Sequence, residues 1–208
     1  MKISKHLHSC LLIEEKDTTV LIDPDVFTAQ EKALDISKLR TLDYILITHE
    51  HPDHCYPPLI KALLKKFPKA VVISNASVAK MLKKESIPVT TMGTEQILLE
   101  EVPHERLWDS EPPLNTMFHL FGRLTHPGDS HHIQKTNDIL ALPIEAPWGS
   151  MRDAVKLALK LKPKIIIPIH DYSLKDTVRQ MTYQRLEAFF KEKNIIFKGL
   201  ETGKIITI

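Results

Sequence analysis

One heptapeptide, residues 48–54, constrains this chain more than any other part of its sequence. It reads Thr-His-Glu-His-Pro-Asp-His, so three imidazoles and the Asp53 carboxylate fall within six residues. The apolar run 43–48 leads directly into it and has the length and composition of a buried strand. Imidazole and carboxylate groups are donors that zinc, iron and manganese accept in proteins. The sequence therefore predicts a metal site at the end of this strand.

The spacing within the heptapeptide suits two adjacent ions. His49 and His51 point to the same side of an extended chain, because alternate side chains share a face. Pro52 favours a turn, after which Asp53 and His54 approach from another direction. The alternative interpretation is a solvated histidine-rich turn, since surface loops collect polar residues. Four donors in this spacing, directly after a buried strand, favour the metal site.

The rest of the sequence mixes strand-like and helical stretches. Strands are expected over residues 11–14, 18–22, 43–48, 71–74, 96–102, 116–121, 123–125, 138–143, 165–169, 195–197 and 204–206, the first two forming a hairpin. Helices are expected over 59–67, 78–84, from the cap Ser150 to near Pro163, and over 175–193. Without an internal repeat or a low-complexity linker, residues 1–208 are expected to form one α+β domain of stacked sheet and helix layers.

The charge of the chain is nearly balanced, with 28 basic and 26 acidic residues and a formal net charge of +2. We therefore expect neither a nucleic acid nor a membrane as partner, but a small-molecule substrate. No apolar run approaches the ~20 residues that span a bilayer, and the first residues lack a secretory pattern. Cys10 and Cys55 suggest no disulfide framework. The expected location is the cytoplasm, and the oligomeric state stays open.

Three later residues follow the ligand order of a known family. The heptapeptide resembles the H-x-H-x-D-H signature of the metallo-β-lactamase superfamily. The next ligands of this family are a histidine after a strand, an aspartate within Gly-Asp-Ser or Gly-Asp-Thr, and a histidine that closes a strand. Here His104 follows 97–102, Asp129 lies in Pro-Gly-Asp-Ser, and His170 closes 165–169. The resemblance covers nearly the whole chain and is specific for fold and metal rather than for substrate.

Other segments extend the resemblance. Residues 8–13 and 21–24 are similar to the first hairpin of the family. Residues 147–170 resemble a branch of predicted zinc-dependent hydrolases that includes ascorbate-6-phosphate lactonase. The fold that the resemblance implies is a four-layer αβ/βα sandwich, with the metals at one edge between the two sheets.

The resemblance also implies a cofactor, two divalent metal ions, with zinc favoured and manganese or iron as alternatives. One ion would be held by His49, His51 and His104, the other by Asp53, His54 and His170, with Asp129 bridging them. Taken alone, His104 reads as a loop histidine, Asp129 as a turn residue and His170 as a buried histidine with satisfied hydrogen bonds. Their order and spacing favour the ligand roles.

Several neighbouring residues are candidates for other roles at the site. His8 and Trp148 are expected to bind substrate, although packing in the core explains Trp148 equally well. Asp23 is expected to be structural or to support a metal-bound histidine, and Cys55 to be a small buried residue. Three histidines flank Asp129 and are expected to be solvated, with a place in the pocket wall as the alternative for one of them: His126, His131 and His132.

The ligand set and the resemblance together predict a hydrolase. Two ions about 3.5–4 Å apart share a water, bring its pKa towards ~7 and present it as a bound hydroxide. Asp53 and Asp129 are the expected catalytic residues, and Asp53 could also accept or donate a proton. The expected substrate is a small ester, lactone or phosphodiester, and the branch resemblance favours a lactonase-like activity.

Two other classes stay open on the same fold. Iron-dependent sulfur dioxygenases and diiron oxidoreductases use it, and iron content with oxygen consumption would distinguish them from a hydrolase. A non-catalytic metal-binding scaffold is disfavoured, because all seven ligand positions are intact whereas degenerate members replace at least one. The motifs do not encode the substrate, since substrate choice lies in the loops around the metals.

Overall fold

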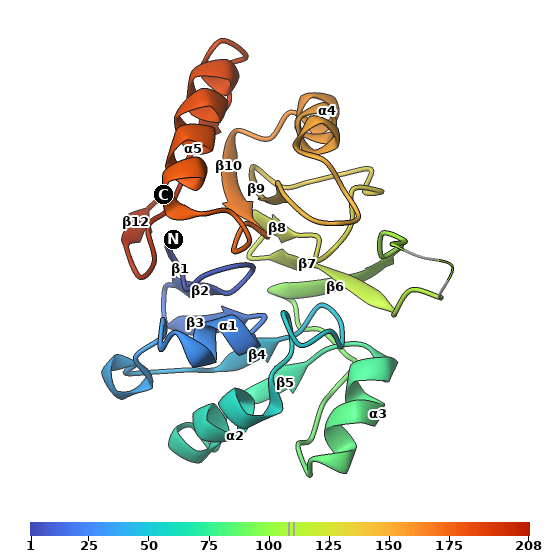
Figure 1. The fold of residues 1–208 in the computed structure, drawn as a ribbon. Helices are drawn as coiled ribbons and strands as arrows, with labels where there is room; N and C mark the ends of the chain where they lie inside the picture. The colour runs from blue at the N-terminus through green and yellow to red at the C-terminus, as the bar shows by residue number, and fades with distance from the viewer. Residues whose placement is uncertain (108, 110) are drawn as a thin grey trace.

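In the computed structural model, which describes residues 1–107, 109 and 111–208, two six-stranded sheets pack face to face (Figure 1). The first sheet has the order β12-β1-β2-β3-β4-β5, antiparallel as far as β3 and parallel from β3 to β5. Its strands are β1 (Lys2–Lys5), β2 (Leu11–Glu15), β3 (Thr18–Ile22), β4 (Tyr44–Leu46), β5 (Val71–Ile73) and β12 (Ile205–Thr207). The predicted hairpin of β2 and β3 is confirmed, and Lys16 in its turn has a φ of 52°.

The second sheet has the order β11-β10-β9-β8-β7-β6 and is parallel from β8 to β11. Its strands are β6 (Ile97–Val102), β7 (Asn115–Leu120), β8 (Leu124–His126), β9 (Ile139–Pro143), β10 (Ile165–Ile169) and β11 (Ile196–Phe197). All five residues of β9 are buried, as expected for a parallel strand covered on both faces.

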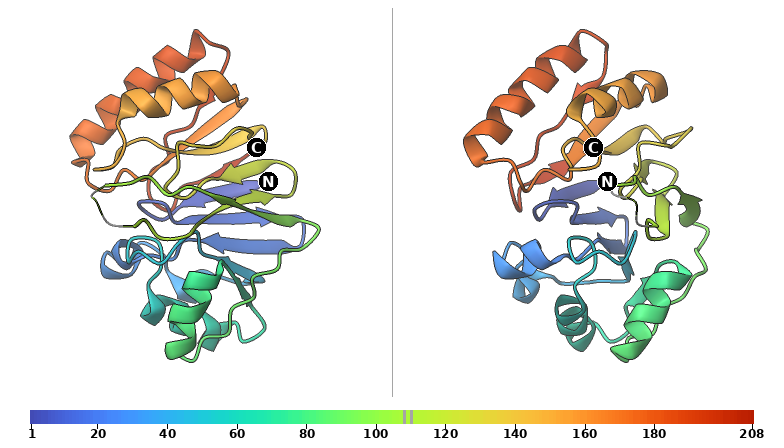
Figure 2. Two further views of the ribbon diagram at one scale, coloured as in Figure 1. Left: turned by 90° about the vertical axis from the view of Figure 1, so that its right-hand side faces the viewer. Right: turned by 45° about the vertical axis from the view of Figure 1, so that its right-hand side comes forward.

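Helices cover the outer face of each sheet (Figure 2). The first sheet carries α1 (Val26–Gln30), the short 3-10 helix η1 (Ile36–Lys38), α2 (Pro57–Lys66) and α3 (Ala76–Lys84). The second carries α4 (Met151–Leu161) and α5 (Asp176–Lys191). The predicted cap of α4 is confirmed, because the Asp153 backbone N–H donates to Ser150 Oγ over 3.2 Å. Among the described residues, none of the helices combines the length and apolarity needed to cross a bilayer.

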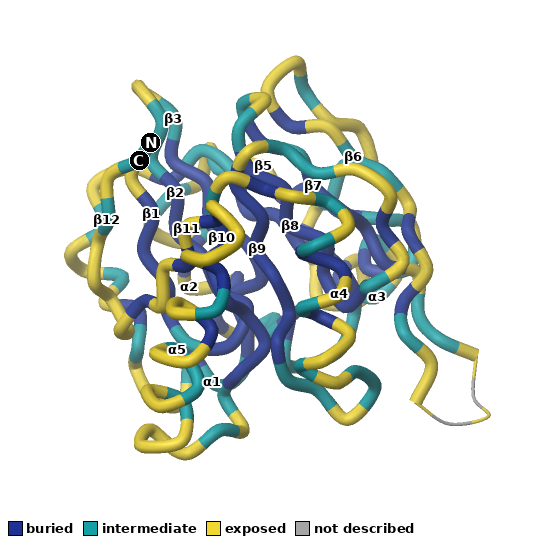
Figure 3. The backbone as a smooth tube through the Cα atoms, turned by 90° about the horizontal axis from the view of Figure 1, so that it is seen from above, coloured by how far each residue is buried: buried dark blue, intermediate teal, exposed yellow. Residues whose placement is uncertain are grey.

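Three apolar clusters hold these layers together. One lies between the sheets and includes Phe118 and Ile167, a second lies between the first sheet and its helices, and a third lies under α4 and α5. Buried backbone accordingly fills the centre of Figure 3, with exposed loops around it. Three cores between four layers confirm the αβ/βα sandwich that the sequence predicts.

The structure adds elements that the sequence analysis missed. Strand β1 carries one purely apolar residue, Ile3, so it lacks the alternation that marks a strand. Helix α1 has only five residues, and its cap Asp25 follows the hairpin directly. Helices α2 and α3 begin two residues earlier than expected, at the prolines 57–58 and after the cap Asn75.

A buried ion pair fastens β1 to the opposite sheet. Lys5 Nζ lies 2.5 Å from Asp171 Oδ1 and 3.0 Å from the Pro168 carbonyl oxygen, and both charged side chains are at most 4% exposed. The Tyr183 hydroxyl of α5 also donates to Asp171. Burial lowers the pKa of Lys5, and the Asp171 carboxylate opposes this shift. This group of contacts thus joins both sheets and α5 at Asp171, the residue after His170.

Replacing Lys5 by methionine should lower the free energy of unfolding by about 3–5 kcal/mol, because it leaves the Asp171 charge buried without a partner. Urea denaturation measures the change. The matched control is Lys61→Met, which breaks the exposed Lys61–Glu85 pair, 2.7 Å long, and should cost less than about 1 kcal/mol. Equal, small losses in both variants would show that the buried pair adds little.

Candidate metal centre

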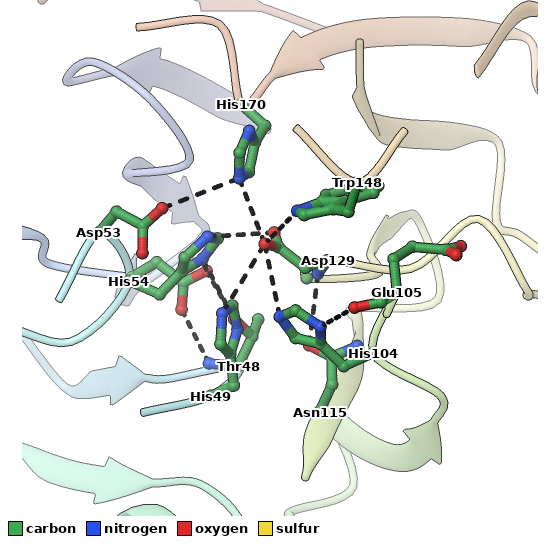
Figure 4. A network of polar contacts seen from close by, with 12 residues as sticks. Thr48, His49, Asp53, His54, His104, Glu105, Asn115, Asp129, Trp148 and His170 are labelled. Carbon is green, nitrogen blue, oxygen red and sulfur yellow. Dashed lines mark hydrogen bonds and ion pairs between the residues drawn. The ribbon is translucent and has the colours of Figure 1, made fainter. Parts of the chain in front are cut away.

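The predicted ligands come from segments that follow four strands. The heptapeptide begins just after β4, His104 lies two residues beyond β6, Asp129 follows β8, and His170 directly follows β10. Figure 4 shows side chains from these segments pointing toward Asp129. Residues far apart in the sequence therefore meet at one place between the two sheets.

Asp129 lies at the centre of this group. Its Oδ1 is 3.1 Å from His54 Nε2, and its Oδ2 is 3.2 Å from His170 Nε2. The same Oδ2 lies 3.6 Å from His104 Nε2 and 3.8 Å from His49 Nε2. One carboxylate thus faces imidazoles on two sides.

The donors form two adjoining clusters around Asp129. In each cluster one atom of every residue lies within 4.8 Å of the others. The first cluster contains His49, His51 and His104, and the second contains His8, Asp53, His54 and His170. The structure therefore brings all seven predicted ligands together and adds His8 to the second cluster.

Unpaired atoms of the cluster test whether a cation fits it. Five of the predicted ligands each bury one atom that has no hydrogen-bond partner among the described residues: Asp129 Oδ1 and the Nε2 atoms of His49, His54, His104 and His170. A buried polar atom left unpaired costs about 1–3 kcal/mol. A divalent cation accepts such lone pairs, so the residues present fit the binding of metal.

The other ring nitrogen of each of these histidines has a partner. The Nδ1 contacts are His49 to Thr48 Oγ1 at 3.0 Å, His54 to Asp23 Oδ2 at 2.7 Å, His104 to the Glu105 carbonyl oxygen at 2.5 Å, and His170 to the Glu145 carbonyl oxygen at 2.7 Å. An Nδ1–H that donates to an oxygen leaves the Nε2 lone pair free, and this arrangement is typical of metal-bound histidine. Asp23 thus supports His54, as the sequence analysis expected.

Opposite charges shift the pKa values at the centre of the cluster. Burial opposes charge on Asp129, but His54, His170 and His49 hold the pKa of its carboxyl well below the usual range. Burial also favours neutral imidazoles, yet Asp129 raises the pKa of His54 and of His170. An ionised carboxylate therefore stands among the imidazoles as a negative donor.

Asp53 and His8 lie side by side in the second cluster, with Asp53 Oδ2 3.3 Å from His8 Nε2. Burial opposes charge on Asp53, but the nearby His8 and His54 lower the pKa of its carboxyl. Burial and the neighbouring His170 lower the pKa of His8 to about 4, so this imidazole is neutral at physiological pH. The Asp53 side chain is 30% exposed and is the more accessible of the two carboxylates.

A tight turn presents Asp129 to the cluster. Gly128 has a φ of 60°, in the left-handed region that favours glycine. Asn115 fixes the turn, since its Nδ2 donates to the Pro127 carbonyl oxygen over 2.9 Å and its Oδ1 accepts the Asp129 backbone N–H over 3.3 Å. His126 Nδ1 accepts the Gly128 N–H over 3.3 Å. The position of the central carboxylate thus depends on neighbours that are not ligands.

Replacing Gly128 by alanine should therefore weaken metal binding at least about tenfold. The added methyl group would overlap Asn115 Oδ1 and lie 2.8 Å from Thr48 Cβ, so the turn must shift. The matched control is Gly122→Ala, which has a similar φ of 63° but no described heavy atom within 4 Å of the added carbon. It should cost only the backbone strain of about 1–2 kcal/mol. Chelator competition measures affinity, and equal metal binding by both variants would contradict the assignment.

The remaining histidines occupy three different environments. His126 is fully buried and donates from Nε2 to the Ser9 carbonyl oxygen over 3.1 Å, so the expected solvated position is wrong. His132 is exposed and pairs with Glu105 at 3.2 Å, as expected. His131 is half-buried against the Trp148 ring, at 5.3 Å between centroids.

Trp148 borders the cluster opposite Asp53. Its indole N–H donates to Asp129 Oδ2 over 3.0 Å, and its ring lies 5.3 Å from that of His170. With His131 it lines a cavity of about 340 Å³. Its predicted contact with substrate stays a prediction, while the bond to Asp129 is a role that the sequence did not suggest. Cys55 is buried, as expected.

Three further residues support the site although the sequence did not point to them: Asn115, Glu105 and Glu145. Asn115 opens β7, and asparagine is rare in strands, which was a usable signal. Glu105 and Glu145 hold ligands through backbone carbonyl oxygens, which any residue supplies. No sequence pattern could have identified these two positions.

Comparison with known proteins agrees with this architecture. Residues 2–170 match the family described as "Beta-lactamase superfamily domain". Protein Rv0786c of Mycobacterium tuberculosis is 30% identical, with 89% of this chain and 91% of the relative covered. A UPF0173 metal-dependent hydrolase of Thermus thermophilus is 28% identical, with 97% and 96% covered.

Solved structures show the same fold. Igni18, described as a novel metallo hydrolase from Ignicoccus hospitalis, superposes with a TM-score of 0.74 at 19% identity, with 100% of this chain and 97% of that chain covered. The match over residues 2–170, the mycobacterial relative and the four-layer sandwich lead to one conclusion. The chain belongs to the metallo-β-lactamase superfamily.

Proposed function

We propose that this protein is a metal-dependent hydrolase that uses two divalent cations to cleave a small ester, lactone or phosphodiester. The observation that carries the proposal is the set of buried, unpaired imidazole nitrogens around Asp129. The names of similar proteins support it, since relatives in Thermus thermophilus and Bacillus thuringiensis are called metal-dependent hydrolases.

Each cluster would hold one ion, and Asp129 would contact both. His49, His51 and His104 would bind the first ion, and Asp53, His54 and His170 the second. When bound, two such cations acidify a coordinated water and polarise a substrate oxygen. Imidazole-rich sets suit zinc best, with manganese or iron as alternatives.

The chain's own groups would orient the reaction. The indole N–H of Trp148 holds Asp129 Oδ2 at 3.0 Å and keeps this carboxylate in place. Asp53, the more exposed carboxylate, can exchange a proton with solvent or with a leaving group on the open side of the cluster. Trp148 and His131 would contact the substrate, because the cavity of about 340 Å³ beside them has the size of a small-molecule pocket.

A lactone is the substrate we favour within this class. The basis is the resemblance of residues 147–170, which include Trp148 and His170, to a branch of predicted zinc-dependent hydrolases that includes ascorbate-6-phosphate lactonase. The cavity is lined by Lys156 and Lys160 as well as by Glu105 and Asp153, so charge alone selects no ligand.

The test assays the purified protein, loaded with the metal that elemental analysis finds, against lactones, thioesters and bis-aryl phosphodiesters. The expected result is turnover of at least one class, lost in the His104→Ala variant. The matched control is His119→Ala, a histidine of β7 outside this cavity and both clusters, which should keep full activity. If the iron-loaded protein consumes oxygen and hydrolyses none of these compounds, the protein is an oxidoreductase and the proposal is wrong. Turnover that survives in His104→Ala would contradict the assigned site.

A further inference from the structure

His8 lies in the second cluster although nothing in the superfamily signature calls for it. It sits in a turn between β1 and β2 in which the Cys10 N–H donates to the Leu7 carbonyl oxygen over 3.0 Å. Leu7 and His8 have φ values of 71° and 36°, a region that non-glycine residues rarely adopt. Such strain costs about 1–3 kcal/mol per residue and collects at functional sites.

The turn is fastened to a ligand of the second cluster. The His170 backbone N–H donates to the His8 carbonyl oxygen over 3.1 Å, and the two rings lie 4.0 Å apart. The His8 ring is 5.4 Å from those of His54 and Phe27. The residue is only 5% exposed, so the strained backbone delivers a buried imidazole to the ligands.

Neither ring nitrogen of His8 has a hydrogen-bond partner among the described residues. Its Nε2 lies 3.3 Å from Asp53 Oδ2, within ion-pair distance but outside the geometry of a hydrogen bond. His54 Nε2 and Asp129 Oδ1 show the same relation at 3.1 Å. In both pairs the imidazole nitrogen is buried and has no hydrogen-bond partner among the described residues, so its lone pair can bind a cation.

The spacing fits two ligands of one ion. Two ligands that each lie about 2.0–2.1 Å from one ion are about 2.9–3.6 Å from each other, and His8 Nε2 and Asp53 Oδ2 are 3.3 Å apart. One donor atom each of His8, Asp53, His54 and His170 lies within 4.8 Å of the others. An ion bound at His8 would also remove the cost of one of its two unpaired nitrogens.

We propose that His8 is a further ligand of the metal ion bound by Asp53, His54 and His170. With Asp129, this ion then has five protein donors, whereas the ion of His49, His51 and His104 has four. Sites with more protein ligands keep fewer positions open. The proposal rests on the proposed function for the presence of two ions.

The His8→Ala variant tests this assignment by competition with a chromophoric zinc chelator, which resolves the two binding steps. The unmodified protein should bind two zinc ions, and the variant should bind one with unchanged affinity and the other at least about tenfold more weakly. His51→Ala should weaken the opposite step, and His132→Ala, an exposed histidine outside both clusters, should change neither. Two unchanged steps in His8→Ala would overturn the assignment.

A second measurement uses the unmodified protein and does not depend on how the variant folds. In protein labelled with ¹⁵N-histidine, zinc should shift one nitrogen of six imidazoles if His8 is a ligand, and of five if it is not. Five shifted imidazoles would overturn the proposal while leaving the proposed function intact. Failure of the unmodified protein to bind zinc, manganese or iron would instead overturn the proposed function.

Discussion

Replacing Asp129 by alanine is expected to abolish metal-dependent turnover while the protein stays folded. The variant loses the Asp129 carboxylate. This group lies 3.1 Å from His54 and 3.2 Å from His170 of the second cluster, and it also faces the histidines of the first cluster. We expect kcat/KM to fall at least about a thousandfold, which corresponds to about 4 kcal/mol of transition-state stabilisation. Steady-state assays measure the loss, and circular dichroism reports the fold.

The matched control for this variant is Asp138→Ala. Asp138 is an exposed carboxylate that pairs with Lys164 at 2.8 Å, and it precedes β9 at the end of the β9–β10 pair opposite His170. Its loss should leave kcat/KM and metal content unchanged. Full activity in Asp129→Ala would rule out the proposed mechanism, because no other described carboxylate lies between the two clusters.

Removing the metal should have the second large effect, on stability as well as on activity. Without cations the buried lone pairs around Asp129 lose their partners, and imidazoles stay crowded against one another. Binding at a hundredfold excess over Kd stabilises a fold by about 2.7 kcal/mol per ion. Two ions therefore correspond to a fall in melting temperature of about 10–20 °C for a chain of this size.

Differential scanning calorimetry with and without a chelator measures this shift. Adding zinc back should restore both the melting temperature and activity. In the Asp129→Ala variant the chelator should change the melting temperature much less, because the metal is already weakly held. A chelator that leaves the unmodified protein equally stable would show that the cluster binds no cation in solution.

Much of the architecture could be predicted from local patterns. The β2–β3 hairpin, the capped helix α4 and the Ile-rich strand β10 each carry their own periodicity or cap. Strand β1 could not be found in this way, because it has no apolar alternation of its own: it is held by pairing with β2 and with β12 at the other end of the chain, and by the buried Lys5–Asp171 pair. Contacts of that kind are decided by tertiary structure and leave no local pattern.

The residues of the site likewise differ in how far local sequence predicts them. The heptapeptide can be recognised as a metal site because its donors are neighbours in sequence. His104 by itself reads as an ordinary loop histidine, and only the ligand order of the family identifies it as a ligand. The supports of the ligands were harder to predict. In the sequence His126 resembles a solvated residue beside a turn. In the structure it is the last residue of β8 and is fully buried, with its Nε2 bonded to the Ser9 carbonyl oxygen.

The most direct measurement is anomalous diffraction at the absorption edge of the bound metal, on crystals of the protein with that metal. The account predicts two peaks about 3.5–4 Å apart, one against His49, His51 and His104, the other against Asp53, His54 and His170, with Asp129 between them. A folded protein whose crystals show no peak among these seven side chains, or place the metal elsewhere, would contradict it.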